Sequence, residues 1–191
     1  MGLIAHRCGD VRIEGLRVEP SGSRVMSTNC DATHFISCSG EIRIARCVFR
    51  GMGDDAANVH GFYLTVRRIE GCRVIVSLDV APQDFEMDLP DPGDQLELVR
   101  SDTLLPYGTG TVLQVFWDGI SRQAELELSG DFMPQAAVGD LLTNRSKAAR
   151  LVFEDNTAEN IRGRALLVQT RHAVVRDNRF VHCTGQGVHV D

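Results

Sequence analysis

The sequence predicts an all-β chain: a right-handed parallel β-helix, or solenoid, with a small antiparallel β-barrel inserted between its coils. Three observations support this fold class. Short strand-like segments recur with a period in the low twenties near both ends of the chain. The repeat stops between about residues 75 and 147, where strand-like runs alternate with turn residues. Amphipathic helical periodicity is nearly absent throughout.

One repeat lies in the C-terminal part of the chain. Residues 151–158 match residues 173–180, and the offset from Asn156 to Asn178 is 22. A period of this length is typical of solenoids of parallel strands, in which each coil packs only against its neighbours. Leucine-rich repeats have similar periods, but they need leucines and a helix in each repeat, and neither pattern is visible here. We expect Asn156 and Asn178 to form an asparagine ladder at one corner of the coils.

A second repeat lies in the N-terminal part. Residues 42–47 match residues 64–69, again with an offset of 22. Residues 1–74 and 148–191 are therefore expected to be consecutive coils of one β-helix. An insertion at the corner of a coil is tolerated because each coil contacts only its neighbours.

The interrupting segment, residues 75–147, has the pattern of a compact antiparallel barrel. Short apolar runs are separated by turn signals, and Gly-Asp pairs at 93–94 and 139–140 each precede such a run. The strand-like runs are residues 95–99, 110–116 and 124–128. Strands of this length with turns between them favour a small closed barrel.

Charge and composition argue against several classes of function. The net charge of −6 argues against nucleic-acid binding, because phosphate requires a cationic surface. No apolar run approaches the ~20 residues of a membrane-spanning helix. The N-terminal segment lacks the apolar core of a signal peptide. The six cysteines include no CxxC pair, so a zinc ribbon is not expected.

Two residue types that often carry function have simpler interpretations here. Cys8, Cys47 and Cys72 lie in or beside apolar strand patterns, and we expect buried free thiols. The scattered arginines alternate with apolar residues, as on the solvated side of a half-buried strand. They include Arg43, Arg46, Arg50, Arg162, Arg164 and Arg171.

The strongest chemical signal is a run of adjacent carboxylates, an amide, an imidazole and three glycines in residues 51–61. Within it, Asp54 and Asp55 follow a glycine at an expected bend, where both side chains can face the same side. Two like charges so close raise one pKa, which suits proton transfer. The simpler interpretation is an aspartate-rich turn whose side chains cap backbone amides.

A second acidic cluster contains Asp31, which lies 23 positions before Asp54. This spacing is close to one coil, so Asp31 is expected on the preceding coil at the same edge. Adjacent strands are about 4.8 Å apart, and side chains can splay that distance. Inverting glycosidases separate their acid and base by roughly 6.5–9.5 Å. We therefore expect Asp31 to be the general acid and Asp55, helped by Asp54, to be the base that activates water.

Polar residues near the same edge are candidates for holding sugar hydroxyls: His34, Asn58, His60, Gln169 and Arg171. The simpler interpretation for each is a structural strand residue. A metal site is not expected. A calcium-dependent polysaccharide lyase would need several aspartates around one ion and a basic residue as proton acceptor. Lys147 is the only lysine, but an arginine could serve, so this alternative stays open.

Three segments together resemble glycoside hydrolase family 110, the α-1,3-galactosidases that remove terminal galactose from blood-group-B-type and linear structures. They are residues 29–35, 51–61 and 165–171. The resemblance implies an inverting mechanism without a metal or organic cofactor. By position, Asp31 matches the proposed acid, and Asp54 and Asp55 match the carboxylates that activate water. A barrel that interrupts a β-helix is also similar to the architecture of that family.

Enzymes of this family are several times longer and are typically secreted or periplasmic, so the chain resembles a fragment-length member. Open ends of a β-helix expose unpaired edges, which would favour homo-oligomers stacked through those ends. Two further functions remain as alternatives: a β-helical polysaccharide lyase, and a non-catalytic carbohydrate-binding or assembly module. The expected partner is a terminal α-galactosyl glycan.

Overall fold

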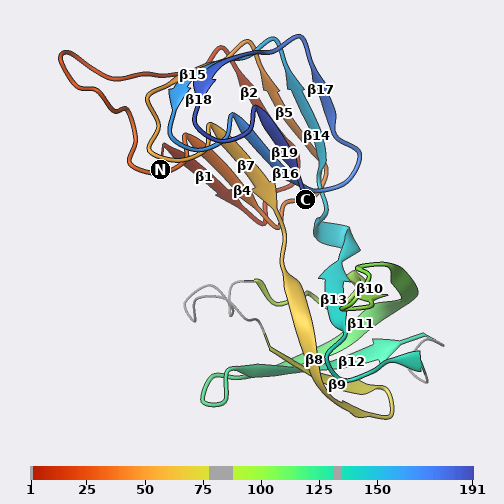
Figure 1. The fold of residues 1–191 in the computed structure, drawn as a ribbon. Coiled ribbons are helices and arrows are strands. Elements are labelled where there is room, and N and C mark those ends of the chain that lie inside the picture. Colours follow the sequence, from red (N-terminus) through yellow and green to blue (C-terminus); the bar gives the residue numbers. More distant parts are fainter. Residues whose placement is uncertain (1, 78–87, 131–134) are drawn as a thin grey trace. The chain divides into compact units, whose positions relative to one another are not determined.

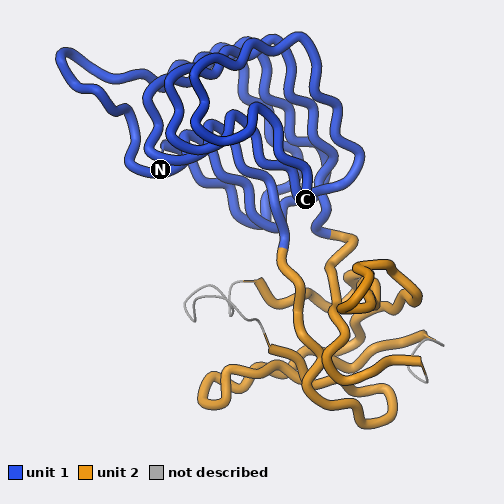
Figure 2. Tube along the Cα trace, viewed as in Figure 1, with its two compact units in different colours: residues 1–61, 147–191 blue, residues 62–146 orange. Residues whose placement is uncertain are grey.

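The computed structural model describes residues 2–77, 88–130 and 135–191. These residues confirm the all-β prediction: strands dominate, with a short 3-10 helix, η3 (Arg145–Lys147), near the end of the central segment. The chain divides into two compact units, residues 1–61 with 147–191 and residues 62–146 (Figure 2). We call them the parallel unit and the barrel unit. No helix in the described ranges is long and apolar enough to cross a membrane.

The parallel unit contains three sheets in which every pairing is parallel (Figure 1). The five-stranded sheet has the order β1 (Leu3–His6), β4 (Thr33–Ile36), β7 (Ala57–His60), β16 (Leu166–Gln169) and β19 (Val188–Val190). One four-stranded sheet has the order β17 (Val174–Arg176), β14 (Arg150–Glu154), β5 (Glu41–Ala45) and β2 (Val11–Glu14). The other has the order β18 (Arg179–Cys183), β15 (Thr157–Ile161), β6 (Val48–Arg50) and β3 (Arg17–Val18).

Alternate residues of each strand build the core of the parallel unit. In the five-stranded sheet, Phe35, Val59 and Val168 lie in register and are at most 2% exposed. The rings of Phe49 and Phe153 stack with centroids 6.5 Å apart. Burial of side chains of this size stabilises the fold by about 1.5–3 kcal/mol each. The stacked apolar rows fix the register of neighbouring strands, because a shift of one residue would turn each row outward.

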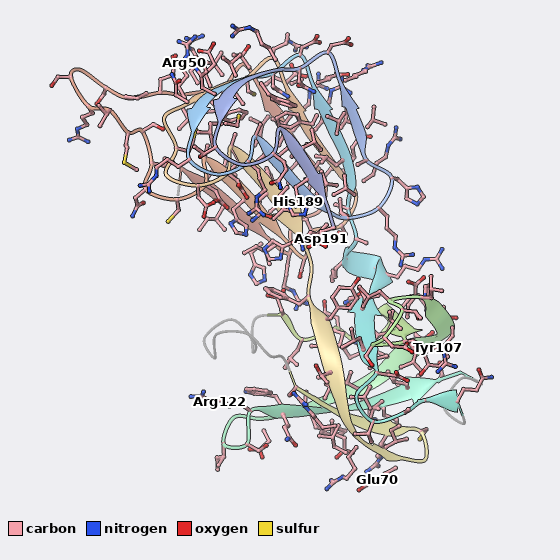
Figure 3. All side chains as sticks on the ribbon, viewed as in Figure 1. Arg50, Glu70, Tyr107, Arg122, His189 and Asp191 are labelled. Carbon is pink, nitrogen blue, oxygen red and sulfur yellow. The ribbon has the colours of Figure 1, made fainter. Side chains whose placement is uncertain are left out.

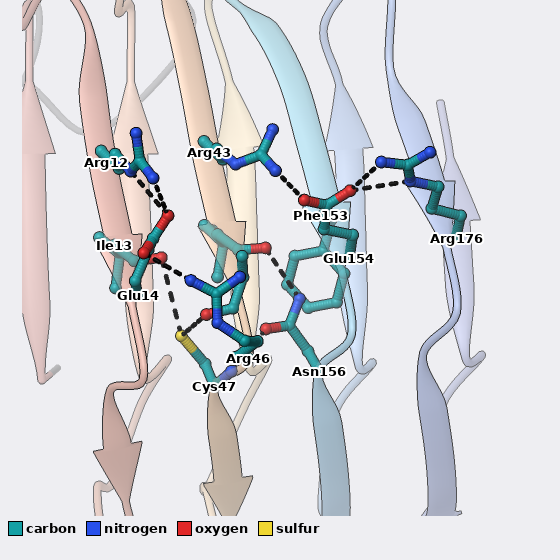
Figure 4. Close-up of polar contacts among 12 residues, drawn as sticks. Arg12, Ile13, Glu14, Arg43, Arg46, Cys47, Phe153, Glu154, Asn156 and Arg176 are labelled. Atoms are coloured by element: carbon teal, nitrogen blue, oxygen red, sulfur yellow. Dashed lines mark hydrogen bonds and ion pairs between the residues drawn. The ribbon is translucent and has the colours of Figure 1, made fainter.

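The predicted asparagine ladder is confirmed at the corner after β14. The Asn156 side chain accepts a hydrogen bond from Cys47 N at 2.9 Å and donates one to Ile44 O at 3.0 Å (Figure 4). Asn178 repeats the pattern one coil later: its Oδ1 accepts from Asn156 N at 2.9 Å. Asn156 is buried, so these bonds satisfy polar groups that would otherwise be costly.

Arginines and glutamates form an ion-pair ladder on the outer face of the sheet that contains β2, β5, β14 and β17 (Figure 4). Arg46 Nη2 lies 2.6 Å from Glu14 Oε2, and Arg176 Nη2 lies 2.5 Å from Glu154 Oε2. Arg43 also pairs with Glu154. Arg43 and Arg176 lie on the outer side of β5 and β14's neighbour β17, as expected, and Arg46 directly follows β5, but all three pair with glutamates of neighbouring strands. The Arg46–Glu14 pair is exposed, whereas Glu154 is buried, with 4% of its surface exposed, and Arg43 and Arg176 compensate its charge.

The barrel unit is a closed barrel with antiparallel pairing throughout. Its strands are β8 (Tyr63–Glu70), β9 (Arg73–Ser77), β10 (Gln95–Val99), β11 (Pro106–Asp118), β12 (Gln123–Ser129) and β13 (Leu141–Asn144). Val66, Leu98, Leu126 and Leu142 are among the buried residues that fill its interior.

The barrel is built from two equivalent three-stranded halves, β8–β9–β10 and β11–β12–β13. Each first strand pairs with the second strand of its own half and with the third strand of the other half. Gly93 N donates to Val112 O at 2.8 Å, and Gly139 N donates to Val66 O at 2.9 Å. The offsets from Val66 to Val112 and from Gly93 to Gly139 are both 46. The two Gly-Asp pairs therefore occupy corresponding positions in the two halves of the barrel.

The expected boundary between coil and barrel at residue 75 is wrong. The compact barrel unit begins at Phe62 and ends at Ser146. Residues 64–69 lie in β8, which pairs with β9 and β13 in the barrel, and not with the coils. The coil neighbour of β5 is β14, with Ile44 opposite Phe153. The match of residues 64–69 to residues 42–47 was misleading because both strands bury alternate residues.

The cysteines differ in part from expectation. All six are free, and Cys47 is buried. Cys8 is only half-buried, and Cys72 is exposed in the turn between β8 and β9. A turn residue has no apolar neighbour on either side, so the flanking strand pattern does not determine its burial.

Candidate functional site

Three neighbouring strands of the five-stranded sheet bring the acidic residues together. Thr33 of β4, Ala57 of β7 and Leu166 of β16 lie side by side in register. Asp31 and Asp55 precede the first two strands by two residues each. The backbone continues the stacking, because Ala32 N donates to Asp55 O at 3.0 Å. One oxygen from each of Asp31, Asp54 and Asp55 lies within 4.8 Å of the others. The structure therefore places the three predicted carboxylates in one cluster.

Asp55 is the most enclosed of the three, with no exposed surface. Its Oδ1 accepts from Arg164 Nε at 2.9 Å and from Arg164 N at 2.7 Å, and its Oδ2 accepts from Arg164 Nη2 at 2.8 Å. A planar guanidinium that grips both oxygens compensates a buried carboxylate far better than a single contact. Asp55 is thus held rigidly and has no surface from which to reach a substrate.

Asp31 is also buried, with 4% of its surface exposed. Its Oδ2 lies 2.7 Å from His34 Nδ1, and its Oδ1 accepts from Asp55 N at 3.2 Å. Burial by itself would raise the pKa of Asp31, but the contacts with His34, the Asp55 amide and Asn58 outweigh it. The net pKa is lowered from its usual value, which favours the ionised form.

Asp54 is the exposed carboxylate of the cluster. Its pKa is raised, first by partial desolvation and then by the negative charges of Asp55 and Asp31. Arg164 opposes this effect in part. The two ends of the cluster therefore differ: Asp54 faces solvent with a raised pKa, and Asp31 lies inside with a lowered one. Separation of pKa values between neighbouring carboxyl groups is a common feature of acid–base sites.

Gly163 allows the next coil to approach the cluster closely. A Cβ atom at this position would lie 2.6 Å from Asp55 Oδ1 and 2.7 Å from Asp54 Oδ1. The second of these carboxylates is the exposed one, so the glycine defines one wall beside it. Any larger residue would displace both side chains.

Two histidines extend the cluster along the sheet. His34 Nε2 lies 2.7 Å from His60 Nε2, and the two rings meet edge-on with centroids 4.9 Å apart. His60 Nδ1 lies 3.1 Å from Gly61 O. Together with the contact between His34 and Asp31, all four ring nitrogens therefore lie close to protein atoms.

The other predicted binding residues are distributed along the same sheet. Asn58 lies beside His34 in register and donates from Nδ2 to Asp31 Oδ2 at 3.5 Å. Its Oδ1 is buried and has no hydrogen-bond partner among the described residues. Gln169 lies beside His60, and its amide donates to Asp191 at 3.1 Å. Arg171 is exposed beyond the end of β16.

The outer face of this sheet continues onto β19. His189 and Asp191, both labelled in Figure 3, lie on this strand and directly after it, next to β16. Leu167 is opposite His189 in register. The sheet thus presents a row of polar side chains from the carboxylate cluster towards its C-terminal edge.

Three carboxylate oxygens within 4.8 Å are a geometry that a divalent cation can use. The donor set does not fit that role well. Both oxygens of Asp55 are occupied by the Arg164 guanidinium, whose positive charge would repel a cation. The same pairing weakens the alternative of a calcium-dependent lyase, which needs several carboxylates directed at the ion.

Arg164 is the site residue that the sequence did not reveal. The alternation pattern placed it on the solvated side of a strand, but only 29% of its side chain is exposed. It lies 109 positions after Asp55, because the barrel separates the two coils in sequence. The register of residues 57–60 against residues 166–169 would have revealed it, but only after the correct boundary of the barrel was known.

No family model matches the chain. Among curated proteins, it is 31% identical over 200 residues to alpha-1,3-galactosidase B of Bacteroides fragilis, an alignment that covers 98% of this chain and 34% of that protein. It is 28% identical to alpha-1,3-galactosidase B of Akkermansia muciniphila over 98% of this chain and 24% of that protein. Alpha-1,3-galactosidase A of Shewanella woodyi is 33% identical over 63% of this chain. The chain thus spans about a third of the length of the first of these relatives.

Proposed function

Because this chain is a relative of the α-1,3-galactosidases of glycoside hydrolase family 110 along 98% of its length, we propose that it is a glycoside hydrolase region acting on terminal α-1,3-linked galactose. The observation that carries the proposal is the carboxylate cluster at the ends of adjacent coils. One of its members, Asp54, is exposed, and two, Asp31 and Asp55, are buried and held by defined partners. Hydrolysis of a glycosidic bond requires two carboxyl groups with different protonation states.

We assign the roles by family resemblance, exposure and contacts. Asp31 is assigned as the general acid from its match to the family motif, and because its lowered pKa favours the ionised form, it must receive a proton before it can protonate the leaving oxygen. Asp54, and not Asp55, is the base that activates water, because Asp55 has no exposed surface and both its oxygens are bound by Arg164. Asp55 and Arg164 are positioning residues. This assignment exchanges the roles of Asp54 and Asp55 relative to the expectation from the sequence.

Inversion at the anomeric carbon is part of the proposal because the resemblance of this chain to family 110 implies it. The clustered oxygens lie within 4.8 Å, which is shorter than the roughly 6.5–9.5 Å between carboxyl groups of inverting glycosidases and nearer the roughly 5–5.5 Å of retaining ones. The anomeric form of the first galactose released distinguishes these outcomes. Nuclear magnetic resonance on a fresh reaction mixture reads it directly, before mutarotation.

Asn58 is the side chain best suited to hold a sugar hydroxyl, because its buried Oδ1 has no protein partner among the described residues. Gln169 and Arg171 extend the binding surface along β16 and beyond its end. His34 and His60, predicted as sugar ligands, have their ring nitrogens close to one another and to protein oxygens. We therefore place them behind the sugar site, where they act on Asp31.

We also infer that the three parallel sheets are the faces of a right-handed β-helix and that the barrel is an insertion between two of its coils. The direct pairing of β7 with β16 supports this, because these strands are adjacent although the barrel separates them in sequence. Association of copies through the edge strands, β1 and β19 among them, is a further part of the proposal.

The test is release of galactose from α-1,3-galactosyl trisaccharides and from a panel of nitrophenyl glycosides. We expect release from terminal α-galactosides and none from β-galactosides or α-glucosides. A non-catalytic carbohydrate-binding or assembly module is the second candidate, because two of the three carboxylates, Asp31 and Asp55, are buried and Arg164 occupies both oxygens of Asp55. That candidate predicts saturable binding of the trisaccharide, measured by calorimetry, with no release of galactose.

A further inference from the structure

We propose that His34 and His60 share a proton and pass it to Asp31, so that this histidine pair reloads the general acid from solvent. The inference rests on the proposed function only for the role of Asp31. The proton-sharing pair itself is a property of the folded chain. It is carried by three contacts: His34 Nδ1 to Asp31 Oδ2 at 2.7 Å, the two Nε2 atoms at 2.7 Å, and His60 Nδ1 to Gly61 O at 3.1 Å.

A count of protons follows from these contacts. Two Nε2 atoms at hydrogen-bond distance need one proton between them, since two lone pairs or two N–H groups would repel each other. His60 Nδ1 must carry a proton, because Gly61 O can only accept. A third proton must lie between His34 and Asp31. Three protons on these three side chains make the group neutral in total: one imidazolium beside a carboxylate, or two neutral rings beside a carboxylic acid.

The proton can move along these three contacts once the His34 ring turns slightly, because His34 Nδ1 lies 2.7 Å from Asp31 Oδ2 but makes no hydrogen bond of good geometry. In the first form, Asp31 is ionised, His34 carries Nδ1–H, and His60 is an imidazolium. The shared proton then moves from His60 Nε2 to His34 Nε2, while the Nδ1 proton of His34 moves to Asp31 Oδ2. Asp31 becomes a carboxylic acid and His60 becomes neutral. When Asp31 gives its proton to the leaving oxygen, one proton from water restores the count, and no electron transfer is involved.

The position of Asp31 explains why such a route is needed. Its surface is 4% exposed, so water reaches it poorly, and a general acid must recover a proton after every turnover. His60 lies at the half-exposed end of the pair. Imidazole is suited to this task because it accepts a proton at one nitrogen and donates from the other.

The groups around the pair come from each neighbouring strand. β1 contributes Ile4 beside His34 and, one row away, His6 beside Ile36. β16 contributes Gln169 beside His60. The charged groups on the same side of the sheet are Asp31, Asp54, Asp55 and Arg164, of which the last two neutralise each other, and Asp191, which accepts from Gln169 beside His60. The ionised Asp31 is therefore the negative group in direct contact with the pair, through His34.

The first experiment does not need activity. Histidine nitrogens are followed by nuclear magnetic resonance from pH 4 to 9 in the full chain, in His60→Gln and in the control His172→Gln, an exposed histidine outside the site. We expect His34 and His60 to respond together in two coupled steps. In His60→Gln we expect a single titration step at a different pH in place of the two coupled steps. In the control variant the two steps should be unchanged. Independent titration of the two rings, with His34 unaffected by His60→Gln, would overturn the proposal.

The second experiment measures the pH dependence of kcat and KM for galactose release. Glutamine at position 60 can accept a hydrogen bond from His34 but cannot relay a proton. We expect His60→Gln to lower kcat at least tenfold at pH 7 and above, up to the ~10²–10⁴-fold expected for loss of a full proton transfer. KM should stay nearly constant, and added imidazole should partly restore the rate. A raised KM with unchanged kcat would instead make His60 a sugar ligand and contradict the relay.

The two experiments distinguish a failure of the proposed hydrolase function from a failure of the proton relay. If the wild-type chain releases no galactose but the rings titrate as a coupled pair, the proposed function fails and the proton-sharing pair stands. If galactose is released but the rings titrate independently, the relay fails alone. The thermal unfolding midpoint of His60→Gln, compared with the control variant, verifies that the fold is intact in both measurements.

Discussion

Arg164 grips Asp55 across two coils that are 109 residues apart in sequence, with Nε 2.9 Å from Oδ1 and Nη2 2.8 Å from Oδ2. Asp55 has no exposed surface, so this contact is what makes a buried negative charge tolerable beside two further aspartates. It connects the parts of the chain before and after the barrel. It also leaves Asp54 as the carboxylate of the cluster that faces solvent.

The first prediction concerns this ion pair. Arg164→Ala leaves a buried carboxylate without its partner, which should cost about 3–5 kcal/mol of unfolding free energy. Arg164→Lys keeps the charge but loses the two-point grip, so an intermediate loss is expected. Arg162→Ala, at an exposed arginine in the same segment, is the control and should change stability by less than about 0.5 kcal/mol. Urea denaturation measures all three, and equal losses for the two alanine variants would show that the pair is unimportant.

The Gly163 contact gives a second prediction. Gly163→Ala places a methyl group against Asp54 and Asp55, and overpacking of this kind typically costs about 1–3 kcal/mol. Galactose release should fall because both carboxylates are displaced. Gly61→Ala is a matched control, since a Cβ there meets no atom within 4 Å. If the two variants had the same unfolding midpoint, the close approach of Gly163 to Asp54 and Asp55 would be contradicted.

Acid stability tests the state of Asp31. Its pKa is lowered in the folded chain despite burial, through His34, the Asp55 amide and Asn58. A carboxyl group with a lowered folded pKa contributes stability above its unfolded pKa, near 3.8, and loses that contribution as the pH falls through the folded pKa. Asp31→Asn should therefore lose less stability than the wild type between pH 5 and pH 2. Parallel stability curves for the two proteins would refute the lowered pKa.

Asp54 should behave in the opposite way. Its pKa is raised by partial desolvation and by Asp55 and Asp31, so its ionisation opposes folding as the pH rises through the folded pKa. Asp54→Asn should stabilise the chain at pH 7, by about 0.5 kcal/mol once solvent screening of this exposed group is considered. The gain should vanish below pH 3, where the aspartate is protonated in both states. Destabilisation at pH 7 would show that Asp54 is a structural turn residue.

Most strands of the parallel unit, and the proximity of the acidic residues, could be predicted from the sequence. Asn156 and Asn178 are genuine coil equivalents, because a polar residue buried at a corner leaves a clear repeat in an apolar pattern. Asp31 and Asp54 were placed on adjacent coils from their spacing alone. The period near 22 applied to both cases because each strand of these coils is followed by a similar short corner.

The residue at which the barrel begins could not be predicted from the 22-residue repeat. β8 alternates apolar and polar residues like a coil strand, and its barrel partners are distant in sequence. Its equivalence to β11, visible in the shared offset of 46 between Val66 and Val112, would have assigned it correctly. Arg164 was missed for the same reason, since its neighbour Asp55 lies before the barrel and Arg164 lies after it.

The most direct test of the central claim is galactose release from an α-1,3-galactosyl trisaccharide by the wild-type chain, Asp54→Asn and Asp55→Asn, all at pH 7. Loss of the exposed carboxylate should lower kcat by roughly 10²–10⁴-fold with the fold intact. Asp55→Asn should lower kcat together with the unfolding midpoint, because Arg164 loses its charged partner. Full activity in Asp54→Asn, or no release of galactose by the wild-type chain, would contradict the proposed hydrolase.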